Sequence, residues 1–547
     1  MSNPIRTLVL TGGQIAAHQY SLASKLIEGA LAAAGMGVTA THDPAAAGNL
    51  ASFDSVVLFT DGDFFTDPQI DALIRFVRGG GGLVSLHTAA KTNERRDDFA
   101  QLIGARVRGG VLCAHKATVV AADHPVMHRV QDYRLDDEIH VLEKTADSTT
   151  LVDAWLNGRR EPLALAKHEG SGRTLHIATG HSLAGLGHPT TLKIITRGVR
   201  WTGGEDWSNK TIKCGCIGYG GAYNMGKTHL QSCARARLTP VAVCDLDPKR
   251  TATARDELGQ HIQTYNNVNG ILDSDAELLI VIVPHNLHAS LSVQCLQAGK
   301  HVVTEKPYTI TVEEATNVIE TARAANKMAT VFHNRRWDGD FVAIKEIVDS
   351  GVIGDVFHIE CAFGGYEEPR ADWWRASKDI SGGAFYDWGA HFVDWVLQLM
   401  PHKIESISGD FKKLKWHGVT IEDYTSAYVR FEGQRSASIE QGAINAIGKS
   451  NWRILGTLGG IEKRGWDWEK KDGLRVVSYG SGRKVESVVP YYKDDWDGFY
   501  RNVADHLLLG EPLAVTPESA RKVIAVLSLA ERSSAAGGAP MKLDFEQ

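Results

Sequence analysis

The sequence has few of the features that stabilise a fold covalently or anchor it in a membrane. Its 547 residues include seven cysteines, an odd number without a C-x-x-C pair, so a disulfide framework is not indicated and buried thiols in a reducing compartment are expected. No apolar run approaches the roughly 20 residues that span a bilayer, and the first six residues lack signal-peptide character. These absences predict a cytoplasmic protein without a membrane partner.

An excess of basic residues is also absent. The chain carries 59 Lys and Arg against 65 Asp and Glu, a net charge of −6, which argues against a general nucleic-acid binder. With 43% apolar and 23% charged residues, the composition is that of a soluble globular protein. The length exceeds what one core supports and suggests about three domains.

The stretch from 211 to 245 has the order of a dinucleotide-binding βαβ unit. An apolar strand runs into a glycine turn, a helical run follows, and a second strand ends on Asp245, 25 residues after Gly220. Gly218 permits the tight turn, while Gly220 and Gly221 let the backbone approach a pyrophosphate. The glycine spacing is longer than G-x-G-x-x-G, which predicts a short insertion. The Asp245 carboxylate disfavours a 2′-phosphate, so NAD is predicted over NADP.

Strands and helices alternate in the first 205 residues, which predicts a parallel sheet covered on both faces. In such sheets function gathers at the carboxyl ends of strands. His87 lies at such an end, on a sharp strand-to-helix junction. The predicted elements are strands at 7–10, 55–59 and 83–88 and helices at 19–35 and 67–78.

Short segments of this region resemble a known family. They are Thr11-Gly12-Gly13, His18-Gln19-Tyr20, Gly80 to His87, Asp123-His124-Pro125, Asp137 to His140, Gly172-Arg173, Gly180-His181 and Gly198 to Trp201. Together they resemble the trehalose-utilisation (ThuA-like) family, which has a class I glutamine amidotransferase-like fold. The resemblance implies a flavodoxin-like three-layer α/β domain linked to sugar catabolism. His87 stands where amidotransferases hold a nucleophilic cysteine and Cys113 lacks an equivalent setting, so amidotransferase chemistry is not predicted.

Eleven of the 22 histidines lie in this first region. Neutral imidazoles and a carboxylate bind Zn²⁺ or a similar divalent metal, although the spacing matches no compact zinc motif. A pocket that uses His18 and His87 for sugar binding or acid–base chemistry without metal is an equal alternative, and a purely structural domain is a third. The candidate metal ligands are His18, His87, His124 and His181, with His115 and Glu138 nearby in the pattern.

A polar, glycine-containing stretch at 202–210 separates this region from the second half. We therefore predict a ThuA-like domain at 1–205, a Rossmann NAD-binding domain at 211–335, and an α+β domain at 336–547 with a largely antiparallel open sheet. The strands of the last domain alternate with period two and lack intervening helices. Its final helices are expected to return to the nucleotide domain.

The second half also resembles a known family. The glycine turn, Pro284-His285-Asn286-Leu287-His288, Glu305-Lys306-Pro307 and Gly382 to Asp394 carry this resemblance. They are similar to the Gfo/Idh/MocA family of nicotinamide-dependent oxidoreductases from about residue 211 to the C-terminus. The resemblance implies that the open sheet makes subunit contacts in a dimer or tetramer.

Three residues form the candidate catalytic set. Lys306 follows a strand and would point its ammonium into the cofactor crevice, where it can stabilise charge as an alcohol becomes a ketone. Asp387 and His391 stand four residues apart on one face of a predicted helix. An imidazole suits a base that takes the hydroxyl proton while hydride leaves the carbon. The alternative is a surface Asp–His pair beside a solvated lysine. The family places its catalytic Lys, Asp and His at these positions.

The remaining candidates surround this set. Pro284, His288 and Glu305 match the cofactor side of the crevice, although His288 would equally cap a helix. Arg335 and Arg336 are expected to hold sugar hydroxyls or cofactor, with an interdomain ion pair as the alternative. Trp374 and Arg375 are expected to stack on a sugar ring, with interface packing as the alternative.

These observations predict an NAD-dependent oxidoreductase that acts on a hydroxyl, at C3 in the most useful case, of a sugar, polyol or glycoside. The first domain is expected to process the resulting keto-sugar. One alternative is redox-neutral glycoside hydrolysis with tightly held NAD. Another is a non-catalytic sensor of NAD or sugar, against which the retained Lys306, Asp387 and His391 argue.

Overall fold

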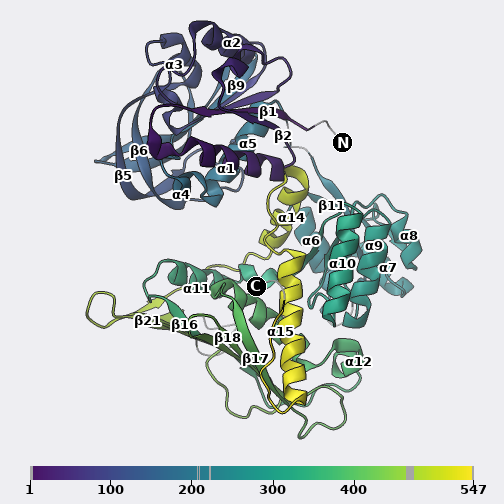
Figure 1. The fold of residues 1–547 in the computed structure, drawn as a ribbon. Helices are drawn as coiled ribbons and strands as arrows, with labels where there is room; N and C mark the ends of the chain where they lie inside the picture. Colours follow the sequence, from purple (N-terminus) through teal and green to yellow (C-terminus); the bar gives the residue numbers. More distant parts are fainter. Residues whose placement is uncertain (1–3, 206, 208–209, 221–222, 464–472, 545–547) are drawn as a thin grey trace. The chain divides into compact units, whose positions relative to one another are not determined.

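The computed structural model describes residues 4–205, 207, 210–220, 223–463 and 473–544. The chain divides into two compact units, one formed by residues 1–210 with 508–512 and the other by 211–507 with 513–547. Figure 1 shows their elements. Within the described ranges, no helix combines the length and apolar character needed to cross a membrane.

The first unit contains a sheet of nine strands among its described residues, in the order β2-β1-β3-β4-β9-β8-β7-β5-β6. Its strands are β1 (Arg6–Gly12), β2 (Gly37–Thr41), β3 (Ser55–Thr60), β4 (Gly82–Leu86), β5 (Ala105–Val119), β6 (Tyr133–Lys144), β7 (Thr149–Leu156), β8 (Arg159–Glu169) and β9 (Gly172–Ile177). Its helices are α1 (Tyr20–Ala33), α2 (Asp67–Arg78), α3 (Asp97–Ile103), α4 (Leu183–Leu186) and α5 (Pro189–Thr202).

The first half of this sheet is parallel and fully buried in β3 and β4, as expected for strands covered by helices on both faces. From β9 onward, β8, β7, β5 and β6 pair antiparallel. The long β5–β6 hairpin is half exposed along β5. The sequence prediction covers the parallel half and does not include this antiparallel extension.

The second unit opens with a parallel sheet in the order β12-β11-β10-β13-β14-β15, the strand order of a doubly wound dinucleotide-binding fold. Its strands are β10 (Ile212–Ile217), β11 (Leu238–Cys244), β12 (Gln263–Tyr265), β13 (Leu278–Val281), β14 (His301–Thr304) and β15 (Ala329–Val331). Its helices are α6 (Met225–Ala234), α7 (Pro248–Leu258), α8 (Val268–Leu272), α9 (His288–Gln297) and α10 (Val312–Ala324).

The rest of this unit contains a sheet of eight strands, counted over the described residues. Strands β16 and β19 pair with each other in parallel, and all other neighbouring strands pair antiparallel. Its strands are β16 (Val356–Gly364), β17 (Ile404–Lys412), β18 (Tyr424–Phe431), β19 (Arg435–Gly442), β20 (Trp452–Gly456), β21 (Gly459–Lys463), β22 (Leu474–Ser478) and β23 (Val485–Val489). The helices are α11 (Gly339–Asp349), α12 (Lys378–Ser381), α13 (Trp388–Leu399), α14 (Asp497–Leu509) and α15 (Pro517–Ala535).

Helix α15 packs along β17 and also against α10 and α13 (Figure 1). Helix α14 contacts the Rossmann part, where Asp497 accepts hydrogen bonds from Ser232 and Arg235. One continuous apolar core joins both parts of the second unit. The predicted fold class, a flavodoxin-like α/β domain, a Rossmann domain and an α+β domain with a largely antiparallel sheet, is confirmed.

Candidate functional site

A cavity of about 840 Å³ opens in the second unit where the Rossmann strands end. Its volume is typical of small-molecule sites. Most of the predicted site residues line it. They are Gly218, Gly220, Asp245, Pro284, His288, Glu305, Lys306, Arg335, Trp374, Arg375, Asp387 and His391. Arg336 is not among the lining residues, and Gly221 lies outside the described part of the chain.

The glycine turn after β10 is shaped by close backbone contacts. Gly218 has φ +96°, and a Cβ there would lie 1.9 Å from the carbonyl oxygen of Ile282. A Cβ at Gly226, in the first turn of α6, would lie 2.8 Å from the Tyr219 ring. Helix α6 begins at Met225, so the turn is longer than in G-x-G-x-x-G. The Asp245 carboxylate accepts the N–H of Tyr219 at 2.7 Å and ties the turn to the end of β11.

Lys306 and Asp387 form the charged centre of the cavity. Lys306 Nζ lies 2.5 Å from Asp387 Oδ1 and donates to the Asp387 carbonyl at 3.2 Å. Burial by itself would raise the pKa of Asp387, but the charges of Lys306 and Arg375 outweigh it and hold the pKa at about 2. The lysine is therefore paired with an ionised carboxylate, which keeps its ammonium at the end of β14.

His391 lies on the first turn of α13 and is 5% exposed. Burial, followed by the charges of Lys306 and Arg335, lowers the pKa of His391 well below its usual range. The imidazole is therefore neutral near pH 7 and able to accept a proton. Asp387 precedes α13 directly and His391 follows one turn later, so one helix start presents both groups to the cavity.

Buried histidines hold the loops that form the cavity wall next to Lys306 and Asp387. His288 places Nδ1 2.7 Å from the Pro307 carbonyl and Nε2 3.0 Å from the Val283 carbonyl. Both of its ring nitrogens thus contact backbone, and its side chain joins the loops after β13 and β14. Glu305 Oε1 lies 2.8 Å from His229 Nε2, and Glu305 Oε2 accepts the N–H of Lys306 at 2.9 Å. These contacts orient the lysine.

Two neighbouring arginines have different surroundings. The Arg335 guanidinium lies over the Trp388 ring, 4.6 Å from its centroid, and lines the cavity. Arg336 instead makes two hydrogen bonds to the Asp394 carboxylate, at 2.8 and 2.6 Å. Both partners of this pair are almost fully buried. Arg375 lies over the rings of Trp374 and Trp373, at 4.3 and 4.7 Å.

Replacement of Arg336 by alanine is expected to lower the free energy of unfolding by about 3 kcal/mol or more, because it leaves the Asp394 carboxylate buried and unpaired. The KM for a small substrate should change little. Denaturant unfolding and steady-state kinetics measure the two effects. Arg335→Ala is the comparison variant. Arg335 lines the cavity, so its loss should raise the KM, and because it also pairs with buried Asp338 at 2.9 Å, it should lower stability as well. A large rise in KM in the Arg336 variant with unchanged stability would contradict this assignment.

The sequence prediction misses other cavity residues, of which Arg250 bears most directly on the cofactor. It lies in the first turn of α7, and its side chain covers Gly220, where a Cβ would approach its Cδ to 2.7 Å. A basic residue shortly after the acid at the end of the second strand is a signal that sequence reasoning could have used. Trp388 and Trp496 also line the cavity, and only long-range packing reveals them.

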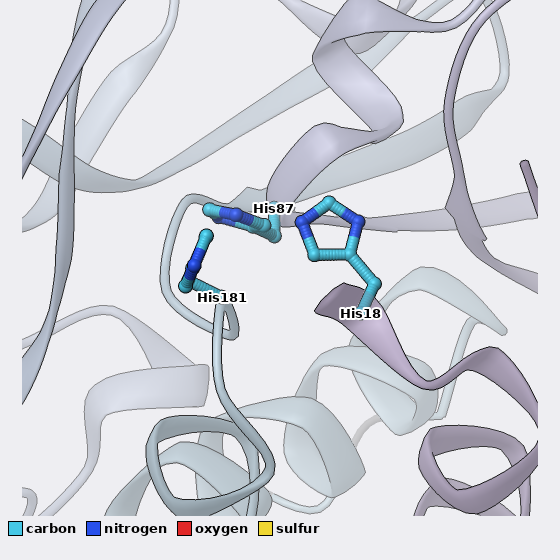
Figure 2. Close-up of side chains that lie close together, drawn as sticks. All are labelled: His18, His87 and His181. Carbon is cyan, nitrogen blue, oxygen red and sulfur yellow. The ribbon is translucent and has the colours of Figure 1, made fainter. Parts of the chain in front are cut away.

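In the first unit, three of the predicted histidines come together at the carboxyl ends of strands (Figure 2). His18 ends a short 3₁₀ turn before α1, His87 follows β4, and His181 follows β9. One nitrogen of each lies within 4.8 Å of the others. Their ring centroids are 5.1 to 5.5 Å apart, with the ring planes nearly perpendicular to one another. His87 has φ +44°, a strained conformation that often accompanies function.

Fixed hydrogen bonds determine which nitrogen of two of these rings is available. His87 Nδ1 lies 2.8 Å from the Ala178 carbonyl, so Nδ1 carries the hydrogen and Nε2 the lone pair. Tyr20 donates its hydroxyl hydrogen to Asp61 and therefore accepts from His18 Nδ1, 3.0 Å away. Burial, followed by the charge of His87, lowers the pKa of His18 to about 4. His18 is thus neutral, with its Nε2 lone pair available.

The Glu138 carboxylate lies beside this cluster. Its Oε2 is 3.1 Å from His181 Nδ1, 3.4 Å from His87 Nε2 and 3.3 Å from His140 Nε2. Over the described residues, none of these nitrogens is aligned with a hydrogen-bond partner. His140 also stacks on His87 at 4.1 Å.

His124 and His115, the other histidines in the predicted pattern, lie elsewhere. His124 Nδ1 accepts the N–H of Val126 at 3.3 Å, and its ring contacts Trp201. His115 Nδ1 lies 2.9 Å from the Cys113 carbonyl. His124 therefore belongs to a local turn, whereas His140, absent from the predicted set, lies in the cluster. Strand pairing that the sequence does not reveal decides which histidines meet.

Comparisons with known proteins match this division of the chain. Residues 6–202 match the trehalose utilisation family, residues 212–333 the oxidoreductase family with an NAD-binding Rossmann fold, and residues 341–462 the GFO/IDH/MocA C-terminal domain. Both resemblances stated from the sequence are confirmed, and the second half matches the NAD-binding and C-terminal domains of the oxidoreductase family.

Individual relatives align with the second half of the chain or part of it. The chain is 29% identical over 285 residues to scyllo-inositol 2-dehydrogenase (NADP(+)) of Bacillus subtilis. This alignment covers 48% of this chain and 78% of that protein. It is 34% identical over 148 residues to inositol 2-dehydrogenase of Salmonella typhimurium, covering 26% and 43%. Among solved structures, an NAD-binding protein from Listeria innocua is 27% identical with a TM-score of 0.54, covering 61% and 97%.

Proposed function

We propose that the second unit oxidises a ring hydroxyl of a sugar, polyol or glycoside. The premise is that this chain joins a trehalose utilisation domain to the two domains of a Gfo/Idh/MocA oxidoreductase. The observation that carries the proposal is the pairing of Lys306 with Asp387, beside neutral His391, in a cavity bounded by the glycine turn. The inositol dehydrogenases among the relatives support a cyclic polyhydroxylated substrate.

In this proposal each group has one role. Nicotinamide, when bound, supplies the hydride acceptor. His391 Nε2 or Nδ1 takes the hydroxyl proton, since burial keeps the ring neutral. Lys306 stabilises the negative charge that develops on the substrate oxygen, and Asp387 holds the ammonium in place. Arg335, Trp374 and Arg375 form the wall against which the sugar ring stacks.

The same proposal assigns the parts of the second unit. Residues 211–335 hold the cofactor through Gly218, Gly220 and the wall formed by Pro284, His288 and Glu305. Residues 336–547 hold the substrate. We also propose that the eight-stranded sheet forms a contact between copies in a dimer or tetramer. Phe357 and Tyr428, large residues on its strands, are 41% and 37% exposed in the single chain.

The direct test is a screen of inositols, monosaccharides and glycosides with NAD and NADP. We expect at least one cyclic polyol to produce reduced cofactor and a product lighter by two hydrogens, detected by absorbance and mass spectrometry. The variant Lys306→Ala should lose both signals. Failure of every polyol to reduce either cofactor would contradict dehydrogenation. Glycoside cleavage without net reduced cofactor would favour the redox-neutral alternative, and cofactor binding without turnover would favour a sensor.

Replacement of Asp245 by alanine is expected to shift cofactor preference from NAD toward NADP. The Asp245 carboxylate at the end of β11 repels a 2′-phosphate, and its removal leaves the nearby Arg250 to attract that group. The ratio of kcat/KM for NAD to that for NADP should fall about tenfold or more. Asp275→Ala, which removes an exposed carboxylate outside the cavity, is the control. An unchanged ratio in the Asp245 variant would place the adenosine ribose elsewhere.

A second candidate function concerns the first unit and rests on the histidine cluster beside Glu138. A carbonyl at C3 of a glycoside acidifies the hydrogen at C2. A base in the cluster takes that proton, the C2–H electrons form a C1–C2 double bond, and the C1–O bond breaks. The same proton is then returned to the departing oxygen, so the aglycone leaves as an alcohol. We propose that the first unit catalyses this elimination on the keto-sugar that the second unit makes.

The full chain with Lys306→Ala separates the two activities, since it cannot make keto-sugar itself. Supplied with a 3-keto-glycoside, it should release the aglycone, and the double variant with His181→Ala should not. Equal release by both variants, or none by either, would argue against elimination in the first unit and leave the dehydrogenase proposal intact.

A further inference from the structure

The histidine cluster of the first unit has the geometry of a coordination sphere. His18, His87 and His181 approach from three different segments, with one nitrogen of each within 4.8 Å of the others (Figure 2). Most buried polar side-chain atoms have at least one hydrogen-bond partner. Here the buried Nε2 of His87 and Nδ1 of His181 have no aligned partner among the described residues. Buried polar atoms that lie close together without partners are costly unless a ligand binds between them.

The outer contacts of the cluster fit the same interpretation. Metal-ligating histidines donate their other ring N–H to a backbone carbonyl, a carboxylate or a similar acceptor, which fixes the tautomer. His87 donates from Nδ1 to the Ala178 carbonyl. His18 donates from Nδ1 to Tyr20, which in turn donates to Asp61. In both rings Nδ1 makes the outer contact, and Nε2 is the nitrogen left to bind a ligand.

A carboxylate lies beside two of the three imidazoles, and with His87 and His140 it forms a second group of closely spaced donor atoms. Two ligand atoms that each lie about 2.1 Å from a tetrahedral ion are about 3.4 Å apart. Glu138 Oε2 is 3.1 Å from His181 Nδ1 and 3.4 Å from His87 Nε2. The loop that carries His181 is anchored by Asp137, 1% exposed, whose carboxylate accepts the N–H groups of Gly180 and Ser182. His181 itself is 27% exposed, which leaves a way in from solvent.

We propose that His18, His87 and His181 bind a divalent first-row transition metal ion, with Glu138 as the neighbouring oxygen donor. Three imidazoles and one carboxylate favour Zn²⁺, Co²⁺ or Mn²⁺ over Ca²⁺ or Mg²⁺, which prefer all-oxygen sites. The partly exposed side at His181 leaves room for one further ligand, as in metal sites with an open position. This site does not depend on the dehydrogenase proposed for the second unit.

The test uses the full chain without an affinity tag, stripped of metal and then dialysed against Zn²⁺, Co²⁺ or Mn²⁺. We expect about one ion per chain by elemental mass spectrometry, and a Co²⁺ absorption spectrum of mixed nitrogen and oxygen ligation. His181→Ala should weaken binding by more than the roughly 10- to 100-fold that loss of an outer contact costs. Tyr20→Phe, which removes the hydroxyl that links His18 Nδ1 to Asp61, should weaken it about tenfold.

His124→Ala is the matched control, because His124 belongs to the same unit but lies outside the cluster. It should bind the ion as the unaltered chain does. Should His181→Ala fail to fold, Tyr20→Phe and Glu138→Gln still give the answer. Less than about 0.1 equivalent of each ion on the unaltered chain, or equal binding by His181→Ala and His124→Ala, would overturn the proposal.

Discussion

Replacement of Lys306 by alanine is expected to lower kcat for polyol oxidation by about 10³-fold or more while cofactor binding persists. The ammonium lies 2.5 Å from Asp387 and faces the cavity, where it stabilises charge on the substrate oxygen only as the reaction proceeds. Groups of this kind typically contribute about 10²- to 10⁴-fold. Steady-state kinetics give kcat, and quenching of protein fluorescence by NADH gives the cofactor Kd.

Lys213→Ala is the matched control for this prediction. Its Nζ pairs with Asp275 on an exposed surface, 3.2 Å away, so kcat should remain within about twofold of the unaltered enzyme, as for most surface pairs. If Lys306→Ala retains kcat within about threefold, the Lys306–Asp387 pair is structural and the chemistry lies with other groups. If NADH affinity falls together with kcat, the lysine positions the cofactor instead.

The sequence predicts a helix or strand well where capping, proline or glycine residues mark the ends of that element. Helix α2 has the predicted bounds, 67–78, because Thr66 and Gln69 form a capping box and Pro68 lies in the first turn. The strands on either side of it are continuous apolar runs, which is typical of buried parallel strands. The Rossmann part is similarly predictable, because the glycine turn, the helix and Asp245 follow one another within a short stretch.

Features that depend on which side chain faces a cavity are not predictable in this way. Arg335 and Arg336 are adjacent, yet one lines the cavity and the other is paired with Asp394. No local pattern favours either, since the direction of the short turn that carries them is set by packing against α13. The histidine cluster shows the same limit. His140 joins it through the pairing of β6 with β5, an antiparallel contact that no local sequence pattern indicates.

Replacement of Gly218 by alanine is expected to destabilise the second unit by about 3 kcal/mol or more and to abolish measurable NAD binding. A Cβ would lie 1.9 Å from the Ile282 carbonyl oxygen, and the Gly218 N–H, bonded to the Cys244 carbonyl at 2.8 Å, prevents the turn from moving away. Overpacking and a left-handed backbone each cost about 1–3 kcal/mol. Thermal unfolding and titration with NADH measure the two losses.

Gly299→Ala separates the two causes. Gly299 has φ +77°, but a Cβ there would have no atom within 4 Å, so alanine meets only the backbone cost of about 1 kcal/mol. It lies after α9, away from the residues that line the cavity, and NADH affinity should not change. A Gly218 variant that is as stable as the Gly299 variant and binds NADH equally well would show that the turn relaxes freely. The close contact with Ile282 would then not be what shapes the cofactor site.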